Sequence, residues 1–163
     1  MKRLVLKGIV AAALFIVPCA AAATLSISIT ATGVTAPTVT LSGVDQPQTF
    51  TVTAVEAYTG GQNTAGWNIT ASATALTTGS QTMPSMSVTG VTSTCNTGCT
   101  TNPTDSITWP VTIGTTASKI FNAAANTGRG TYNVIATFSV PYPANAIPGT
   151  YTSTVTLATA TGP

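Results

Sequence analysis

Apolar and polar residues alternate along most of this chain with the two-residue period of a half-buried β-strand. In residues 24–30, for example, Leu25, Ile27 and Ile29 alternate with serine and threonine. Comparable runs occupy residues 38–41, 49–58, 67–76, 86–91, 106–113, 132–140 and 150–159. These runs lack the helical period and are rich in threonine, valine and isoleucine, which favour strands. The pattern therefore predicts an all-β protein.

Glycine and proline residues separate these runs and predict turns between short strands. About eight or nine short strands in a chain of 163 residues are typical of a single antiparallel β-sandwich of immunoglobulin-like type. Only residues 118–126, with three consecutive alanines, could instead form a short helix. From the alternation in the two C-terminal strands we expect buried side chains for Tyr132, Val134, Phe138, Val155 and Leu157.

The first 23 residues have the pattern of a secretory signal peptide. Three basic residues precede an apolar run at residues 9–17, and Pro18 and several small residues follow it. We expect cleavage after Ala23, so that Cys19 leaves with the peptide and residues 24–163 form one domain. The apolar run is shorter than the roughly 20 residues of a membrane span. The sequence thus predicts an exported protein that is soluble or bound at the cell surface, with no membrane span in the mature chain.

The mature chain would carry very few charges. Its two basic residues, Lys119 and Arg129, stand against three acidic ones, Asp45, Glu56 and Asp105, which gives a net charge of −1. So weak a charge provides no basic surface that would attract nucleic acid or an anionic membrane. We therefore expect no nucleic-acid partner.

Two cysteines would remain in the mature chain, Cys95 and Cys99. Because an exported protein meets an oxidising environment, a disulfide between them is the expected state. A metal site needs further ligands, and the chain contains no histidine to supply them. A redox motif usually has two residues between its cysteines rather than three. We expect a structural disulfide and no metal or cofactor.

Catalysis has little support in the composition. Without histidine, a Ser-His-Asp or Cys-His arrangement cannot form. A glycosidase needs a pair of carboxylates, and the mature chain has only three acidic residues in all. Glu56 could pair with Arg129 or Lys119, or it could join Asp105 in a calcium site that lacks any known loop signature. We expect a protein that is not an enzyme.

Several short motifs follow one another in a distinctive order. Residues 55–61, with an acidic residue and a glycine-rich turn, precede Gly66-Trp67-Asn68-Ile69. Residues 119–132 lead through Val140-Pro141 into residues 146–151 and a last strand. This order resembles the WxL domain family, non-covalent cell-wall-binding proteins of Gram-positive bacteria. The second Trp-x-Leu of that family is replaced by Leu157, Ala158 and Thr159, so the distal tryptophan is missing.

The resemblance implies a surface that binds cell-wall glycan, and a few side chains suit such a ligand. Aromatic rings can cover the apolar face of a sugar, and amides can bond its hydroxyl groups. The candidate ligand-binding residues are Tyr58, Gln62, Asn63, Trp67 and Tyr142. An ordinary hairpin turn would equally explain the first three, whereas Trp67 and Trp109 lie in alternating strands that suit a core position. We expect Tyr142 to be exposed between its two neighbouring prolines.

Two functions from different classes follow. The first is a non-catalytic surface protein that binds cell-wall polysaccharide or peptidoglycan non-covalently. The second is a structural subunit of a surface layer or fibre that assembles through exposed strand edges. In the second case its partners would be other surface proteins or further copies of itself.

Overall fold

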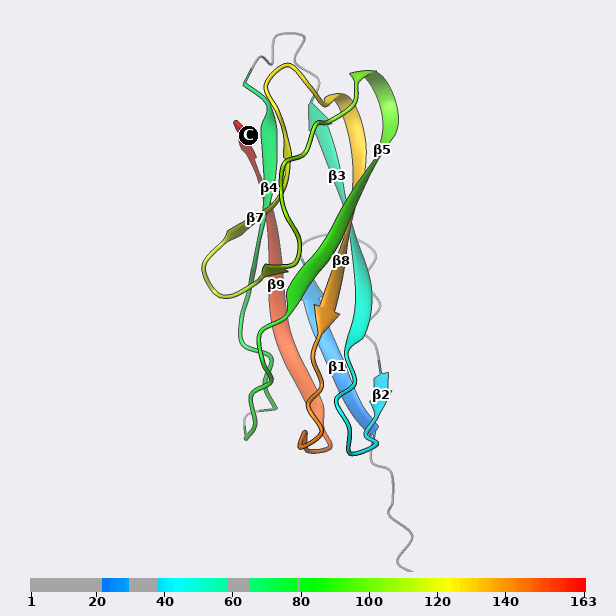
Figure 1. Ribbon diagram of the computed structural model, residues 1–163, viewed down its shortest axis with the longest axis vertical. Coiled ribbons are helices and arrows are strands. Elements are labelled where there is room, and N and C mark those ends of the chain that lie inside the picture. Colours follow the sequence, from blue (N-terminus) through cyan, green and yellow to red (C-terminus); the bar gives the residue numbers. More distant parts are fainter. Residues whose placement is uncertain (1–21, 30–37, 59–64, 79) are drawn as a thin grey trace, which may run out of the picture.

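The computed structural model describes residues 22–29, 38–58, 65–78 and 80–163. These residues form nine β-strands and no helix (Figure 1). The strands are β1 (Ala22–Ile29), β2 (Thr38–Thr40), β3 (Gln48–Tyr58), β4 (Trp67–Ala73), β5 (Ser87–Thr101), β6 (Val111–Thr112), β7 (Ser118–Ala123), β8 (Arg129–Val140) and β9 (Thr150–Thr161). None of the described residues forms a helix that is long and apolar enough to cross a membrane.

The strands form two sheets, and most of them run roughly along the long axis of the molecule in Figure 1. One sheet has the order β2-β1-β9-β4-β7 and the other has the order β3-β8-β5-β6. All neighbouring strands are antiparallel except β1 and β9, which are parallel. One cluster of buried side chains draws on both sheets. The predicted all-β sandwich is confirmed.

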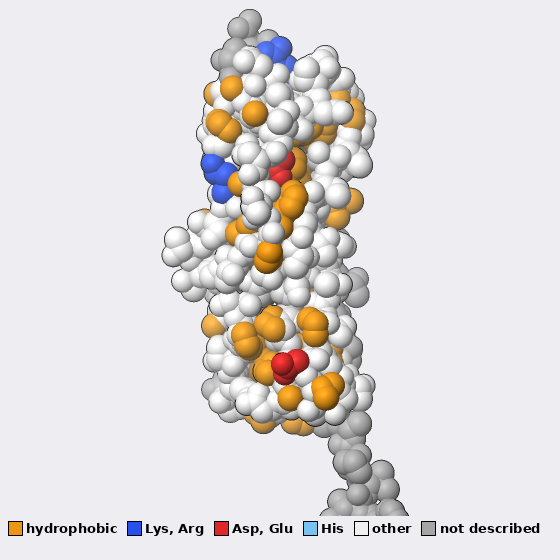
Figure 2. All heavy atoms as spheres, viewed as in Figure 1, with side chains coloured by type: hydrophobic (Ala, Val, Ile, Leu, Met, Phe, Trp, Pro, Cys, Tyr) orange, Lys and Arg blue, Asp and Glu red, His pale blue; other side chains and the backbone are white. Residues whose placement is uncertain are grey.

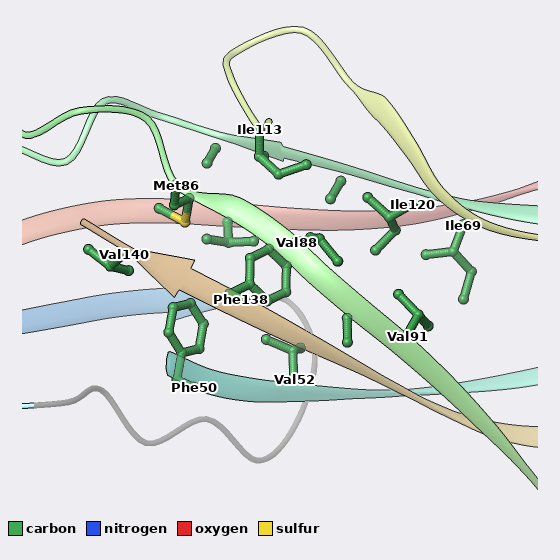
Figure 3. Packing of buried hydrophobic residues seen from close by; sticks show 14 of the residues in the cluster. Phe50, Val52, Ile69, Met86, Val88, Val91, Ile113, Ile120, Phe138 and Val140 are labelled. Atoms are coloured by element: carbon green, nitrogen blue, oxygen red, sulfur yellow. The ribbon is translucent and has the colours of Figure 1, made fainter. Parts of the chain in front are cut away.

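The core lies between the two sheets, and Figure 3 shows the middle of it. The alternation in β8 and β9 places Tyr132, Val134, Phe138 and Val155 in this core, as predicted. Phe138 stacks on Phe50 of β3, with ring centroids 5.1 Å apart. The prediction is wrong for Leu157, which is only partly buried, because the buried face of β9 ends at Val155.

Two segments differ from the expected elements. Residues 118–123, which could have formed a helix, are strand β7, because Ile120 and Phe121 are buried in the core while the strand pairs with β4. In residues 106–113 only β6 is a strand. The polar groups before it bond to side chains instead of a neighbouring strand: Ile107 N donates to Asp105 Oδ1 at 3.2 Å, and Ser106 N donates to Asn122 Oδ1 at 3.0 Å.

The predicted disulfide between Cys95 and Cys99 is present, with 6.0 Å between the two Cα atoms. It lies inside the long strand β5 rather than in a loop between two strands. The pairing of β5 with β8 shifts register on both sides of Thr97, which accommodates the extra residues of the bridged segment. Gly130 of β8 packs against Cys99, and a Cβ atom at Gly130 would lie 2.7 Å from the Cys99 Cα.

The first two residues of strand β1, Ala22 and Ala23, belong to the predicted signal peptide. Ala22 and Ala23 pair with Thr40 and Val39 of β2, whereas residues 24–29 pair with β9. Cleavage after Ala23 would therefore keep the whole parallel ladder between β1 and β9. It would remove two of the three residue pairs that join β1 to β2.

Candidate functional site

Trp67, which was a candidate ligand-binding residue, is fully buried at the start of β4. Its Nε1 donates a hydrogen bond to the Gly128 carbonyl oxygen at 2.9 Å. Its ring lies 5.5 Å from the ring of Phe121 and 6.4 Å from that of Tyr132, measured between centroids. The structure therefore gives Trp67 a packing role, and its ring presents no surface to a ligand. Trp109 is partly buried against the same core and donates to the Ile120 carbonyl oxygen at 3.1 Å.

The other candidates divide into two groups. Tyr58 is the last residue of β3, where its backbone pairs with Gly130. The Tyr58 side chain and the residues Gln62 and Asn63 lie outside the described residues. Tyr142, which was expected to be exposed, is instead buried with 1% of its surface accessible. The expectation was wrong because the segment that contains Tyr142 packs against the segment that leads into β3.

A surface recess lies at the end of the sandwich where Tyr142 is found. We call it the proline recess, and its lining residues are Asp45, Gln46, Pro47, Pro84, Pro141, Tyr142 and Pro143. Its volume is about 310 Å³. These residues come from three loops, which enter β3, enter β5 and connect β8 to β9. The recess thus exists only after the two sheets have brought these loops together.

Hydrogen bonds between the loops fix the walls of the proline recess. Gln46 N donates to the Tyr142 carbonyl oxygen at 2.8 Å, and Ala144 N donates to Asp45 Oδ1 at 2.8 Å. The Gln46 amide nitrogen also donates to Ser42 Oγ. Because proline has a fixed φ angle, the four proline residues further stiffen the lining. The recess is therefore largely formed before any ligand arrives.

Behind the recess, Gln81 holds the loop between β8 and β9 in place. Its Oε1 accepts hydrogen bonds from Ile147 N at 2.8 Å and from the hydroxyl group of Tyr151. Its Nε2 donates to the Asn145 carbonyl oxygen at 3.1 Å. Since Tyr151 is itself fully buried in β9, this amide ties the loop to the core of the sandwich.

Two polar atoms of the lining residues have unused hydrogen-bonding capacity. Gln46 Oε1 and the Tyr142 hydroxyl oxygen are buried and have no hydrogen-bond partner within the described residues. Buried polar atoms in proteins almost always bond to a protein group, a water molecule or a ligand. Burial, together with the nearby Tyr151, raises the pKa of Tyr142 from 10.0 to about 12. Its hydroxyl group therefore keeps its proton at neutral pH and can donate.

Exposed apolar side chains gather at the same end of the molecule. Among the described residues, the large hydrophobic side chains that stand out as exposed are Val44 at 61% and Ile147 at 41%. Both belong to loops that line or support the proline recess. Figure 2 shows hydrophobic side chains around an acidic side chain near the lower end of this face. Exposed apolar groups next to a recess are typical of binding surfaces.

A second recess of about 300 Å³ lies beside the first, and Pro84 lines both. Its lining combines the buried residues Met83 and Met86 with the hydroxyl-bearing residues Thr82, Ser85 and Thr115. The described residues contain no group of three or more histidine, cysteine, aspartate or glutamate side chains that could hold a metal ion. What the two recesses offer is apolar contact and neutral hydrogen-bonding groups, with Asp45 as the carboxylate of their linings.

Comparisons of the chain with protein-family models, with curated proteins and with solved structures find no match. Of the candidate residues, the structure places Tyr142 at a recess and Trp67 in the core. Sequence reasoning missed Asp45, Gln46 and Pro84. The available signal was the number of prolines in the loops, but sequence spacing does not reveal that Pro47, Pro84 and Pro141 converge.

Proposed function

We propose that the protein is a secreted, non-catalytic surface protein that binds cell-wall polysaccharide or peptidoglycan non-covalently through the proline recess. The signal-peptide pattern and the order of motifs that resembles the WxL domain family support the location and the class of ligand. The observation that carries the proposal is a recess whose lining combines four prolines with Gln46 and Tyr142, each of which has a buried polar atom without a partner within the described residues.

The chemistry of the recess suits a sugar. A pyranose ring has apolar C–H faces and hydroxyl groups around its edge, so it needs a mainly apolar site with a few placed polar groups. The proline rings supply the apolar surface, and Gln46 Oε1 can accept a hydrogen bond from a sugar hydroxyl. The second carboxylate oxygen of Asp45 can accept another, because Oδ1 already bonds to Ala144 N.

The low charge of the protein determines how this binding should respond to salt. With a net charge of −1 in the mature chain, long-range attraction contributes little to association. Hydrogen bonds and apolar contacts at short range are only weakly screened by ions. Moderate salt should therefore release little of the protein from cell walls, and complete release would indicate a charged partner instead.

The experiment is a titrated pull-down of the secreted protein with purified cell walls, in which Gln46→Leu is compared with Asn96→Leu. The first change removes the Gln46 side-chain amide, whose Oε1 has no partner within the described residues. The control removes an exposed amide from β5 next to the disulfide. The Gln46→Leu variant should bind walls about three- to tenfold more weakly, because it loses one hydrogen bond to the ligand. The control should bind like the unmodified protein.

Two outcomes would contradict the proposal in different ways. If the unmodified protein is not retained on walls at all, the proposed function is wrong. If both variants are retained like the unmodified protein, the recess is not the contact site. A third variant, with Tyr58, Gln62 and Asn63 all changed to alanine, then tests whether the glycine-rich loop after β3 makes the contact, as the sequence pattern had indicated.

A further inference from the structure

The two sheets end in four edge strands of very different length. In the five-stranded sheet the edges are β2, with 3 residues, and β7, with 6 residues. In the four-stranded sheet they are β6, with 2 residues, and β3, with 11 residues. An edge strand exposes a row of backbone N–H and C=O groups that can pair with another chain, and proteins usually shorten or disrupt such edges. Strand β3 is the exception here.

Strand β3 also lacks a bulge, a lysine and a proline, which protect many edges, and its one charged residue is Glu56. It pairs with β8 over all eleven residues without a register shift, so no bulge bends it away. No lysine, arginine or proline occurs between Gln48 and Tyr58. By contrast, β7 carries Lys119, and its pairing with β4 shifts register. Within the described part of the chain, β8 is the only strand that pairs with β3.

We propose that β3 is a self-association edge, on which β3 of a second copy of this chain pairs antiparallel about a twofold axis at Thr53. Thr53 is the middle residue of the strand. In this register odd-numbered residues lie opposite odd-numbered residues, so both copies keep the same faces toward core and solvent. The pairing would join two four-stranded sheets edge to edge into one continuous sheet.

The residues of the strand favour a second copy as the occupant. Phe50 and Val52 are buried in the core, whereas Thr49 and Thr51 are exposed on the opposite face. A twofold axis brings identical strands together, so no complementary charge pattern is needed from a different partner. The axis places Thr53 opposite its own copy and Thr51 opposite position 55, with no like charges opposed. Threonine is also among the residues that pair well across strands.

The test uses charge at the axis. Thr53→Lys and Thr53→Glu each place two like charges directly opposite one another in the proposed dimer, whereas a mixture of the two variants places opposite charges there. The control is Thr92→Lys, which adds the same charge to an exposed position of the inner strand β5. The secreted proteins are compared by sedimentation velocity over a range of concentrations, without cell-wall material.

The unmodified protein should form a dimer as its concentration rises, with β3 amides exchanging more slowly in the dimer. Each like-charged variant should raise the dimer dissociation constant about fivefold. The mixture should recover dimers that are sensitive to salt, and Thr92→Lys should behave like the unmodified protein. The proposal is wrong if the unmodified protein remains monomeric at every concentration. It is equally wrong if Thr53→Lys and Thr92→Lys have the same effect, or if the mixture does not recover the dimer.

Discussion

The two ends of the sandwich are built in contrasting ways. At the end that holds Trp67, a large aromatic side chain fills the space between the sheets, and its one polar atom bonds to Gly128. At the end that holds Tyr142, loops enclose the proline recess. Buried polar atoms without a partner within the described residues occur at both ends: Gln46 Oε1 and the Tyr142 hydroxyl oxygen here, and Asp105 Oδ2 and Arg129 Nε near Trp67. Only the recess therefore distinguishes the Tyr142 end in this comparison. The contrast suggests that the first end stabilises the fold while the second end keeps capacity for a ligand. Substitutions at the Trp67 end should therefore lower stability and leave ligand binding unchanged. Substitutions at the Tyr142 end should weaken ligand binding and hardly change stability.

The largest effect on stability should come from Trp67→Ala. Removing a fully buried tryptophan leaves a cavity and should lower the free energy of unfolding by about 3–5 kcal/mol. Chemical denaturation of the protein measures this loss. Trp109→Ala is the matched control and should cost less, because Trp109 is only partly buried. An equal loss in the two variants would show that the complete burial of Trp67 does not make it the more important of the two for stability.

A pair of glycine substitutions compares the two ends directly. Gly128 and Gly43 both have positive φ angles, 67° and 76°, so an alanine at either position is strained. A Cβ atom at Gly128 would also lie 2.7 Å from Trp67 Nε1, whereas one at Gly43 would meet no atom within 4 Å. We expect Gly128→Ala to cost about 3 kcal/mol and Gly43→Ala about 1 kcal/mol. Thermal melts of both variants measure the difference, and a larger loss at Gly43 would contradict the comparison.

The disulfide next to Gly130 should contribute less than the tryptophan. A loop this short should stabilise the protein by about 2 kcal/mol, because closing it restricts the unfolded chain only slightly. The variant with Cys95 and Cys99 both changed to serine should show this loss in denaturant titrations. Its binding to cell walls should be unchanged, because the disulfide lies at the end opposite the proline recess. If the variant also loses wall binding, the contact site lies near the disulfide and not at the proline recess.

The smallest effect at neutral pH should come from Tyr142→Phe. The Tyr142 hydroxyl group makes no hydrogen bond within the described residues, so its removal should hardly change the melting temperature. Tyr151→Phe is the control and should cost about 1 kcal/mol, because the Tyr151 hydroxyl group donates to Gln81 and Ile147. A similar loss in both variants would mean that Tyr142 has a partner in solution.

The same variant should also change the behaviour at high pH. The pKa of Tyr142 is raised to about 12 in the folded protein, from the usual 10.0 that the unfolded chain would have. Its contribution to stability is therefore complete below pH 10.0 and is lost as the pH rises through about 12. Melting temperatures should fall less steeply over this interval for Tyr142→Phe than for the unmodified protein. The melting temperature of Tyr142→Phe should still fall somewhat at high pH, because burial raises the pKa of Tyr132 as well.

The two-residue period was sufficient to predict most strands and four core residues of β8 and β9, because inward positions alternate along a strand. It failed at Leu157, because the buried face of β9 ends at Val155. It also failed in residues 106–110, where Ser106 N and Ile107 N donate to the side chains of Asn122 and Asp105 in place of a neighbouring strand. The proline recess could not be predicted at all. Its residues are far apart in the sequence, and only the order of strands in the two sheets brings their loops together.

If the proposed function is right, the Tyr142 end binds the ligand and the Trp67 end does not. Hydrogen exchange of the protein, with and without solubilised cell-wall glycan, distinguishes the two ends. We expect slower exchange at amides around the recess, those of Gln46, Tyr142, Ala144 and Ile147, and no change around Trp67 and Gly128. Protection that is confined to the Trp67 end, or exchange that is unaffected everywhere while the glycan is in excess, would contradict the account.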